Sequence, residues 1–409
     1  MSDNKKTNIK KPDVKFCSSC VYPSSSAVSL EFDKNGKCSG CNISTEKETI
    51  NWQDRKLKLK KLFKNYEKKG NKHYDCIIPV SGGKDSYFQA HIVKELGYNA
   101  LLVTYNANNY TETGLKNVQK MRESFGFDHI FYTPAVNTLK KLNRLGMLVM
   151  GDMNWHAHSG IFTYPIRVAV EKNIPLMIWG EHGRTDVGGM FSHNDFIEFT
   201  YRDRLEHACR GFEWNDMIKF GEKYGESLTE KEMYAWIYPS DEEIDRVGVR
   251  GIFISNYVKW EANEHLKLVK EKYGFLESEV EFERTYRKMS NLDDMHENGL
   301  HDYLKFIKFG YGRTSDHASK DIRANLMDRK KGVQEVMKRD HIKSNDLIRW
   351  LNYVGWDEKK FDEVCDQFRD PRTWWIKNGN WMKKDIDGKE KEYGKVVLPN
   401  KMRNKFYIE

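Results

Sequence analysis

The stretch Ser81–Ser86, with the sequence SGGKDS, constrains the fold of this chain more than any other. An apolar run at 76–80 leads into it, and the run 88–96 behind it has apolar residues at helical spacing. The six residues are therefore predicted to form a turn from a strand into a helix. Two glycines allow a close backbone approach, the helix N-terminus offers unpaired N–H groups, and Lys84 adds a cation. We expect a polyphosphate-binding turn; the alternative is a glycine–serine turn without a ligand.

The loop is not of the Walker A type, which needs G-x-x-x-x-G-K-[ST], and it lacks the G-x-G-x-x-G dinucleotide fingerprint. It resembles the PP-loop, S-G-G-x-D-S, of the adenine-nucleotide alpha-hydrolase-like enzymes. That resemblance implies a loop that grips the pyrophosphate of ATP while the α-phosphate is attacked, with Asp85 as a Mg²⁺ ligand or a loop organiser. The nucleotide-binding residues would be Ser81, Gly82, Gly83, Lys84, Asp85 and Ser86.

From residue 74 onward, short apolar runs alternate with longer amphipathic ones, which is typical of a parallel α/β sheet with flanking helices. The predicted strands are 75–80, 99–105, 129–133, 175–180 and 251–255, and the predicted helices are 85–96, 112–125 and 158–172. Residues 181–250 would then be a largely helical excursion. Ligands bind beyond the carboxyl ends of such strands. This rule adds Thr104, for adenosine, and Glu181, which could hold Mg²⁺ or orient ammonia or be an ordinary loop acid.

Four of the seven cysteines follow the pattern C-x2-C-x17-C-x2-C, which fits a tetrahedral four-cysteine zinc site. They are Cys17, Cys20, Cys38 and Cys41. No export signal is recognisable, so metal ligation is expected in place of disulfides. Residues 28–32 alternate like a strand and 33–36 suit a turn, which predicts a small ribbon. With four thiolate ligands the zinc would be structural; the alternatives are a redox dithiol pair or an iron–sulfur cluster.

Length and charge set the broad class of the chain. Its 409 residues suffice for two or three domains, and the net charge of +8 arises from 68 basic and 60 acidic residues. No apolar run approaches the ~18 residues of a membrane span, so we expect a cytoplasmic protein with no membrane or nucleic-acid partner. The predicted domains are a disordered basic lead-in with the zinc knuckle at 1–50, a linker helix at 51–72, a PP-loop ATP-binding domain at 73–258, and a helical C-terminal region for substrate or partner at 259–409.

Within that C-terminal region, the stretch 308–316 interrupts the helical pattern. Two glycines flank Tyr311 and Arg313 follows, which predicts a flexible loop with an aromatic face and an anion clamp. Tyr311, Gly312 and Arg313 are accordingly candidate substrate-binding residues; the alternative is a plain helix-to-helix turn. His156 and His158, two positions apart, do not share a helical face and predict no metal site.

Taken in order, the motifs resemble those of the N-acetyl sugar amidotransferase family of lipopolysaccharide and pseudaminic or legionaminic acid biosynthesis. After the cysteine knuckle, Trp52 and the PP-loop come PIRVAV at 165–170, IWGE at 178–181, GVRGIF at 248–253 and FGYGR at 309–313. The resemblance covers nearly all of the chain from about Phe16. It implies an ATP-dependent conversion of an acetamido group on a nucleotide-activated sugar to an acetamidino group, through adenylylation and attack by ammonia. Lys84, Asp85 and Glu181 would be catalytic, with ammonia supplied by a partner glutaminase and a (βα)8-barrel synthase-like subunit.

Two other functions stay open. A tRNA-modifying PP-loop enzyme of the thiolation type would want a reactive cysteine pair and a contiguous basic face. The spare cysteines Cys76, Cys209 and Cys365 stand apart from one another in the sequence. A non-catalytic zinc-ribbon adaptor would carry a vestigial nucleotide site, against which the intact Lys84 and Asp85 count.

Overall fold

The computed structural model describes residues 9–67, 69, 71–106 and 109–409, and the chain forms two compact units. The terminal unit comprises Met1–Asn42, Glu283–Tyr286 and Leu300–Glu409; the sheet unit comprises Ile43–Phe282 and Arg287–Gly299. The part of the predicted lead-in at residues 1–8 lies outside the described residues. Among the described residues, no helix is both long and apolar enough to cross a membrane.

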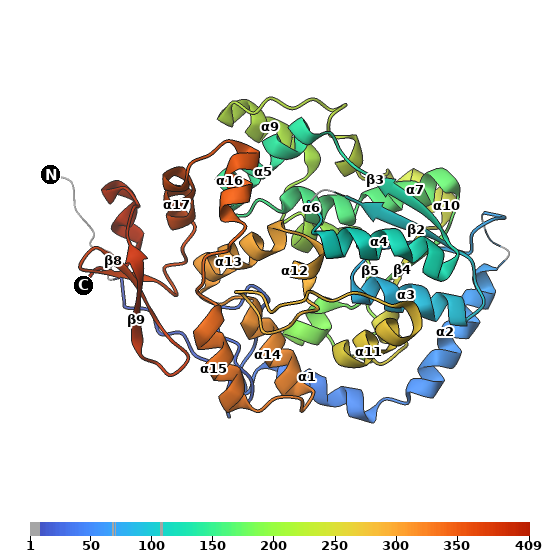
Figure 1. The fold of residues 1–409 in the computed structure, drawn as a ribbon, viewed down its shortest axis with the longest axis horizontal. Helices are drawn as coiled ribbons and strands as arrows, with labels where there is room; N and C mark the ends of the chain where they lie inside the picture. The colour runs from blue at the N-terminus through green and yellow to red at the C-terminus, as the bar shows by residue number, and fades with distance from the viewer. Residues whose placement is uncertain (1–8, 68, 70, 107–108) are drawn as a thin grey trace. The chain divides into compact units, whose positions relative to one another are not determined.

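A six-stranded sheet in the order β3-β2-β1-β4-β6-β5 forms the centre of the sheet unit (Figure 1). The strands are β1 (Cys76–Pro79), β2 (Ala100–Tyr105), β3 (Asp128–Tyr132), β4 (Leu176–Trp179), β5 (Glu198–Phe199) and β6 (Arg250–Phe253). Neighbouring strands are parallel except β5, which pairs antiparallel with β6. The predicted parallel sheet is therefore confirmed, with an unpredicted antiparallel strand at one edge.

Helices cover both faces of the sheet because its strands are apolar on both sides. Alternate residues of β1 point to opposite faces. Ile78 packs with α3 (Lys84–Glu95) and α11 (Ala262–Tyr273) in one core cluster, whereas Ile77 packs with α7 (Tyr164–Lys172) in another. The PP-loop at the end of β1 is thus anchored by a strand that is buried on both sides.

The sheet unit also contains α2 (Trp52–Tyr66), α4 (Glu112–Phe125), α5 (Val136–Met150), α6 (Trp155–Ile161), α8 (Tyr201–Asp203), α9 (Trp214–Tyr224), α10 (Asp241–Val247) and α12 (Asn291–Asp294). The helices of this unit differ from the sequence prediction in two places. The helix expected at 158–172 is two helices, α6 and α7, because Pro165, in the first turn of α7, has no N–H to donate to the carbonyl of Ile161 in a continuous helix. The helix α5 was not predicted at all.

The terminal unit contains helices and a small antiparallel sheet. Its elements are most of α13 (Glu297–Phe309), then α14 (Arg313–Arg323), α15 (Arg329–Arg339), α16 (Leu347–Val354), α17 (Glu358–Gln367), β7 (Trp375–Lys377), β8 (Asn380–Lys384) and β9 (Glu390–Lys395). Asn378 and Gly379 have φ of 51° and 75° and close the β7–β8 hairpin. The strand expected at 28–32 is reduced to a single bridge between Phe32 and Cys38.

Candidate nucleotide site and cysteine cluster

The PP-loop joins the end of β1 to the start of α3 in the position that the sequence predicts. Gly82 has a φ of 93°, and a Cβ there would lie 2.6 Å from Cβ of Val118, so only glycine fits. Within the loop, Oγ of Ser86 accepts a hydrogen bond from the Ser81 N–H at 2.9 Å. The phenol of Tyr110 donates to the Ser81 carbonyl at 2.8 Å. The loop is therefore held in one conformation with the N-terminus of α3 behind it.

Three polar side chains form a chain of contacts at the start of α3. The Lys84 ammonium donates to Oδ2 of Asp85 at 2.7 Å, and Oδ1 of Asp85 lies 3.5 Å from Nδ1 of His265. Nε2 of His265 accepts the Glu261 N–H at 3.3 Å, which leaves Nδ1 to carry the proton toward Asp85. Burial acts to raise the pKa of Asp85, but Lys84 and His265 together hold it below its usual range. Asp85 is thus ionised and organises the loop.

A cavity of about 340 Å³ lies beside the loop, at the carboxyl ends of β1 and β4. From β1 the sheet continues to β2 and β3 on one side and to β4 and β6 on the other, so this is the topological switch point where such sheets bind ligands. The predicted residues that line it are Ser81, Asp85, Ser86 and Glu181. Aromatic side chains form much of the remaining wall: Tyr105, Phe162, Trp179 and Trp260.

Thr104, the predicted adenosine contact, is buried within the sheet. Its hydroxyl donates to the Val80 carbonyl at 2.7 Å and lies 2.8 Å from Nε2 of His129. Its neighbours Val103 and Tyr105 line the cavity instead. Thr104 therefore supports the end of β1 from the adjacent strand, and its direct contact with nucleotide stays a prediction.

Sequence reasoning missed Asp294, which lines the same cavity from the end of α12. Asp294 is 5% exposed, and its Oδ2 lies 2.7 Å from where a Cβ of Gly83 would be. Burial raises the pKa of this carboxyl well above its usual range, against the lowering effect of Lys84. No motif marks the segment NLDD at 291–294, because only the folded chain brings it to the PP-loop.

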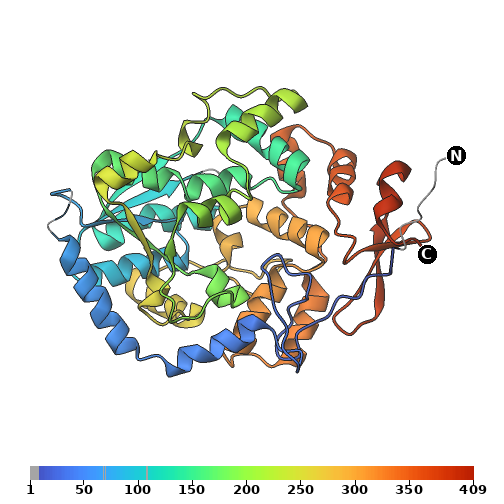
Figure 2. The ribbon, with the colours of Figure 1, turned by 180° about the vertical axis from the view of Figure 1, so that it is seen from behind.

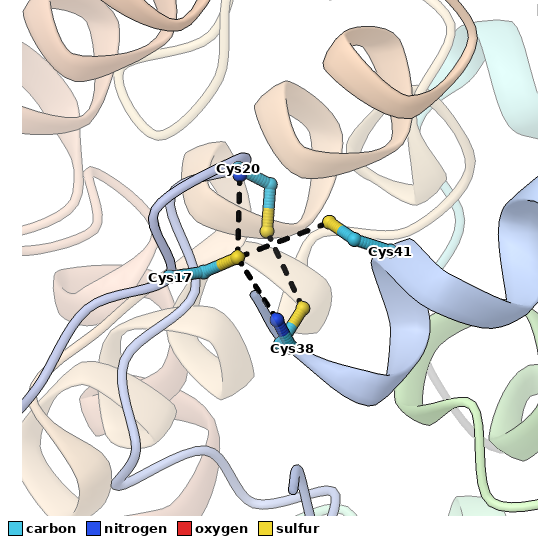
Figure 3. A group of neighbouring side chains, drawn as sticks. All are labelled: Cys17, Cys20, Cys38 and Cys41. Carbon is cyan, nitrogen blue, oxygen red and sulfur yellow. Dashed lines mark hydrogen bonds between the residues drawn. The ribbon is translucent and has the colours of Figure 1, made fainter. Parts of the chain in front are cut away.

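The four predicted metal ligands converge in the terminal unit (Figure 3). All four sulfurs lie within 4.8 Å of one another; those of Cys17 and Cys41 are 3.9 Å apart, and those of Cys20 and Cys38 are 3.7 Å apart. Four sulfurs placed tetrahedrally at about 2.3 Å from one ion would be about 3.8 Å apart. Backbone N–H groups of Cys20 and Cys38 point at Sγ of Cys17, at 3.4 and 3.2 Å. The cluster is thus preformed for a single metal ion.

Two arginines from the C-terminal helices support this cluster, and Figure 2 shows the N-terminal segment in dark blue beside α14 and α15. Nε and an NH2 group of Arg323 donate to Sγ of Cys41 and Cys38, both at 3.4 Å. Arg329 donates to the carbonyls of Cys20 and Cys17 at 3.1 and 3.2 Å. Because four thiolates around a divalent ion carry a net negative charge, the Arg323 guanidinium compensates part of it.

We expect Arg323→Met to weaken metal binding by roughly 10- to 100-fold, since a hydrogen-bonded cation next to the ligands is lost. The measurement is competition for the bound metal with a chromophoric chelator. Lys330→Met is the matched control, because it removes an exposed cation from α15, a helix that also carries an arginine at the cluster. Equal affinities for the two variants would contradict the role of Arg323.

Of the predicted substrate residues, Tyr311 and Gly312 lie in the turn between α13 and α14, and Arg313 is the first residue of α14. Arg313 donates to Oδ2 of the fully buried Asp302 at 2.8 Å. The Gly312 N–H donates to Asp340 at 2.8 Å, and the Tyr311 hydroxyl accepts from the Ala27 N–H at 3.1 Å. All three thus have partners inside the terminal unit, and a role in substrate binding stays a prediction.

Arg313→Ala should destabilise the terminal unit by about 3–5 kcal/mol, because it leaves the buried Asp302 carboxylate without its cation. Urea unfolding followed by tryptophan fluorescence measures this loss. The double variant Asp302→Asn/Arg313→Met removes both charges and should recover much of it. An unfolding midpoint unchanged in Arg313→Ala, together with weakened sugar binding, would favour the anion clamp instead.

Comparison with known proteins gives a family match for one segment of the chain, which includes residues of both units. Residues 281–386 match the family described as "LPS biosynthesis protein WbpG-like, C-terminal domain". An uncharacterized protein of Methanocaldococcus jannaschii, MJ1599, is 26% identical over 113 residues, which are 27% of this chain and 40% of that protein. The match therefore spans less than half of the archaeal relative.

Two solved structures align at low scores. The U34-tRNA thiolase NcsA of Methanococcus maripaludis, with its [4Fe-4S] cluster, has a TM-score of 0.31 and 14% identity over 83% of this chain and 95% of its own. The NH3-dependent NAD synthetase of Campylobacter jejuni has a TM-score of 0.27 and 11% identity over 48% of this chain and 92% of its own.

The family match rests on the sequence of residues 281–386, whereas the PP-loop is identified from the sequence of Ser81–Ser86 and its position between β1 and α3. The matched segment contains both Asp294, at the PP-loop cavity, and Arg323, at the cysteine cluster. In agreement with the resemblance drawn from the ordered motifs, residues 281–386 match the C-terminal domain of the WbpG-like lipopolysaccharide biosynthesis proteins, and Ser81–Ser86 have the sequence and position of a PP-loop.

Proposed function

We propose that this protein is an ATP-dependent, AMP-forming amidotransferase that converts the acetamido group of a nucleotide-activated N-acetyl sugar to an acetamidino group. One observation carries the proposal. A PP-loop with an intact lysine opens into a cavity at the switch point of the sheet, in a chain whose residues 281–386 match a lipopolysaccharide biosynthesis domain.

The chemistry answers a leaving-group problem, because an amide oxygen departs poorly. The acetamido oxygen attacks the α-phosphorus of ATP, the bond from that phosphorus to the bridging oxygen breaks, and pyrophosphate leaves with its electron pair. Ammonia then adds to the activated carbon, the carbon–oxygen bond breaks, and AMP leaves. The oxygen of the amide departs on AMP, and the proton lost from ammonia passes to solvent.

Residues of the PP-loop and of the cavity wall suit the first of these steps. Lys84 and the N–H groups at the start of α3 would stabilise the charge that develops on pyrophosphate. Asp85 keeps Lys84 in place through its 2.7 Å contact. Glu181, which also lines the cavity, would orient ammonia. A bound Mg²⁺ would neutralise further charge on the phosphates, and Zn²⁺ at the cysteine cluster would be structural because four thiolates fill its coordination sphere.

Cysteine burial disfavours the thiolation alternative. Sulfur transfer needs an accessible thiolate. Apart from the cluster, the chain has Cys76, Cys209 and Cys365, and all three are buried with pKa values raised by desolvation. An ammonia-using enzyme needs no such thiol, and we include in the proposal a glutaminase and a (βα)8-barrel subunit as its source of ammonia.

Mass spectrometry of nucleotide-linked N-acetyl sugars tests the proposal, after incubation with ATP, Mg²⁺ and ¹⁵N-labelled ammonium. Replacement of oxygen by ¹⁵NH leaves the nominal mass unchanged, whereas ¹⁴N-ammonium gives a product lighter by one mass unit. The isotope pair therefore identifies the amidine, and AMP should form in equal amount. AMP formation without any sugar product, or sulfur incorporation into tRNA, would reject the proposal.

A further inference from the structure

We propose that Asp294, and not the PP-loop residue Asp85, is the protein carboxylate that binds the divalent cation accompanying the polyphosphate. The inference rests on the proposed use of ATP at this cavity. It concerns how the nucleotide is held and is independent of which sugar is modified.

Both oxygens of Asp85 face polar side chains of the protein itself. Oδ2 accepts from Lys84 at 2.7 Å, and Oδ1 faces the proton-bearing Nδ1 of His265 at 3.5 Å. His265 is fixed in turn by stacking on Phe88, with ring centroids 3.5 Å apart and planes inclined by 14°. A cation bound by Asp85 would have to displace Lys84 from Oδ2 or come between Oδ1 and His265. Asp85 therefore fits the role of loop organiser.

Asp294 has no ion-pair partner among the described residues, and its Oδ1 is buried without a hydrogen bond among them. Its Oδ2 lies 2.7 Å from where a Cβ of Gly83, in the phosphate-binding turn, would be. The side chain lines the cavity together with Ser81 and Ser86. An unpartnered buried carboxylate is costly, and here it lies beside the place where a polyphosphate would sit.

The carboxylate of Asp294 and the phosphates of a bound nucleotide would both be negatively charged and close together, so a cation is needed between them. An ionised Asp294 facing phosphate oxygens would repel them strongly in a partly desolvated site. Mg²⁺ is commonly held by one or two carboxylates together with substrate phosphates and water. Asp294 would supply the carboxylate ligand and the nucleotide the phosphate ligands. A cation bound by both would give Oδ1 of Asp294 a partner and remove the repulsion.

The backbone around Asp294 is fixed, which a metal ligand requires. The Thr111 N–H donates to the Asp294 carbonyl at 2.9 Å, and the His296 N–H donates to the Asn109 carbonyl at 3.0 Å. Tyr110 and Met295 form an antiparallel bridge between these contacts. Tyr110 also donates to the Ser81 carbonyl, so one residue joins the Asp294 segment to the PP-loop.

Binding measurements with Mn²⁺ as the probe test this assignment without turnover. The nucleotide is an ATP analogue with a methylene bridge between the α and β phosphates, and the variant is Asp294→Asn. With Mn²⁺ present, calorimetry should show at least about 10-fold weaker binding of the analogue. The electron paramagnetic resonance signal of free Mn²⁺ should rise accordingly. In EDTA, the same variant should bind the analogue as tightly as the natural chain or more tightly, because a repelling charge is gone.

The matched control is Asp293→Asn, which removes the neighbouring buried carboxylate that does not line the cavity. It should leave the dependence on Mn²⁺ unchanged. Equal weakening of Asp294→Asn with Mn²⁺ and in EDTA, or no weakening in either, would overturn the assignment. If Asp294 governs Mn²⁺-dependent binding while no sugar is ever amidinated, the inference stands and the proposed function falls.

Discussion

Lys84→Ala is expected to lower the rate of AMP formation by on the order of a hundredfold or more, since it removes a preorganised cation from the charge that develops on pyrophosphate. Asp85→Ala should have a similar effect, because Asp85 holds Lys84 through a 2.7 Å contact and is itself supported by His265. Both side chains lie at the start of α3, where truncation to alanine keeps a good helix former. Single-turnover assays of AMP and pyrophosphate measure the loss.

The matched control is Lys94→Ala, an exposed lysine in the last turn of the same helix, which should keep normal turnover. Thermal unfolding should be nearly unchanged in all three variants. A near-normal rate of AMP formation in both Lys84→Ala and Asp85→Ala would mean that this loop is not the catalytic site.

Local pattern was enough to predict the parallel sheet. A strand such as β2 is apolar except for Thr104, so its short apolar run was enough to predict a strand. The edge strand β5 has two residues and no pattern of its own; it exists because β6 offers an unpaired edge. The β7–β8 hairpin carries a local turn signal, Asn378-Gly379, with both residues at positive φ.

The candidate site likewise contains residues that the sequence pattern identified and residues that it did not. Ser81–Ser86 and the four cysteines were found because each forms a compact motif whose spacing reflects backbone geometry. Asp294, His265 and Arg323 were missed because tertiary packing alone brings them to those motifs. A lone acid, histidine or arginine on a helix has no distinguishing sequence, so partners of a motif must be located in the fold.

Removal of the metal is expected to unfold the cysteine segment and to lower the melting temperature of the terminal unit in proportion to the metal lost. The apparent binding free energy of structural zinc, about 10–16 kcal/mol in small zinc domains, is also folding free energy. Cys38→Ser should act like chelation, because the Cys38 sulfur lies 3.7 Å from that of Cys20 and accepts from Arg323. Calorimetric scans with and without chelator, alongside metal analysis, measure the effect.

Cys365→Ala is the matched control for Cys38→Ser, since it removes a buried thiol of the same unit that lies outside the cluster. It should retain the metal and lose only the smaller stability that belongs to a core truncation. Metal affinity of the natural chain should fall as the pH is lowered, because the thiols must lose their protons to bind. Iron with a visible charge-transfer band would contradict zinc; a four-iron cluster would also need the sulfurs farther apart than 3.7–3.9 Å, because each thiolate would bind a different iron atom.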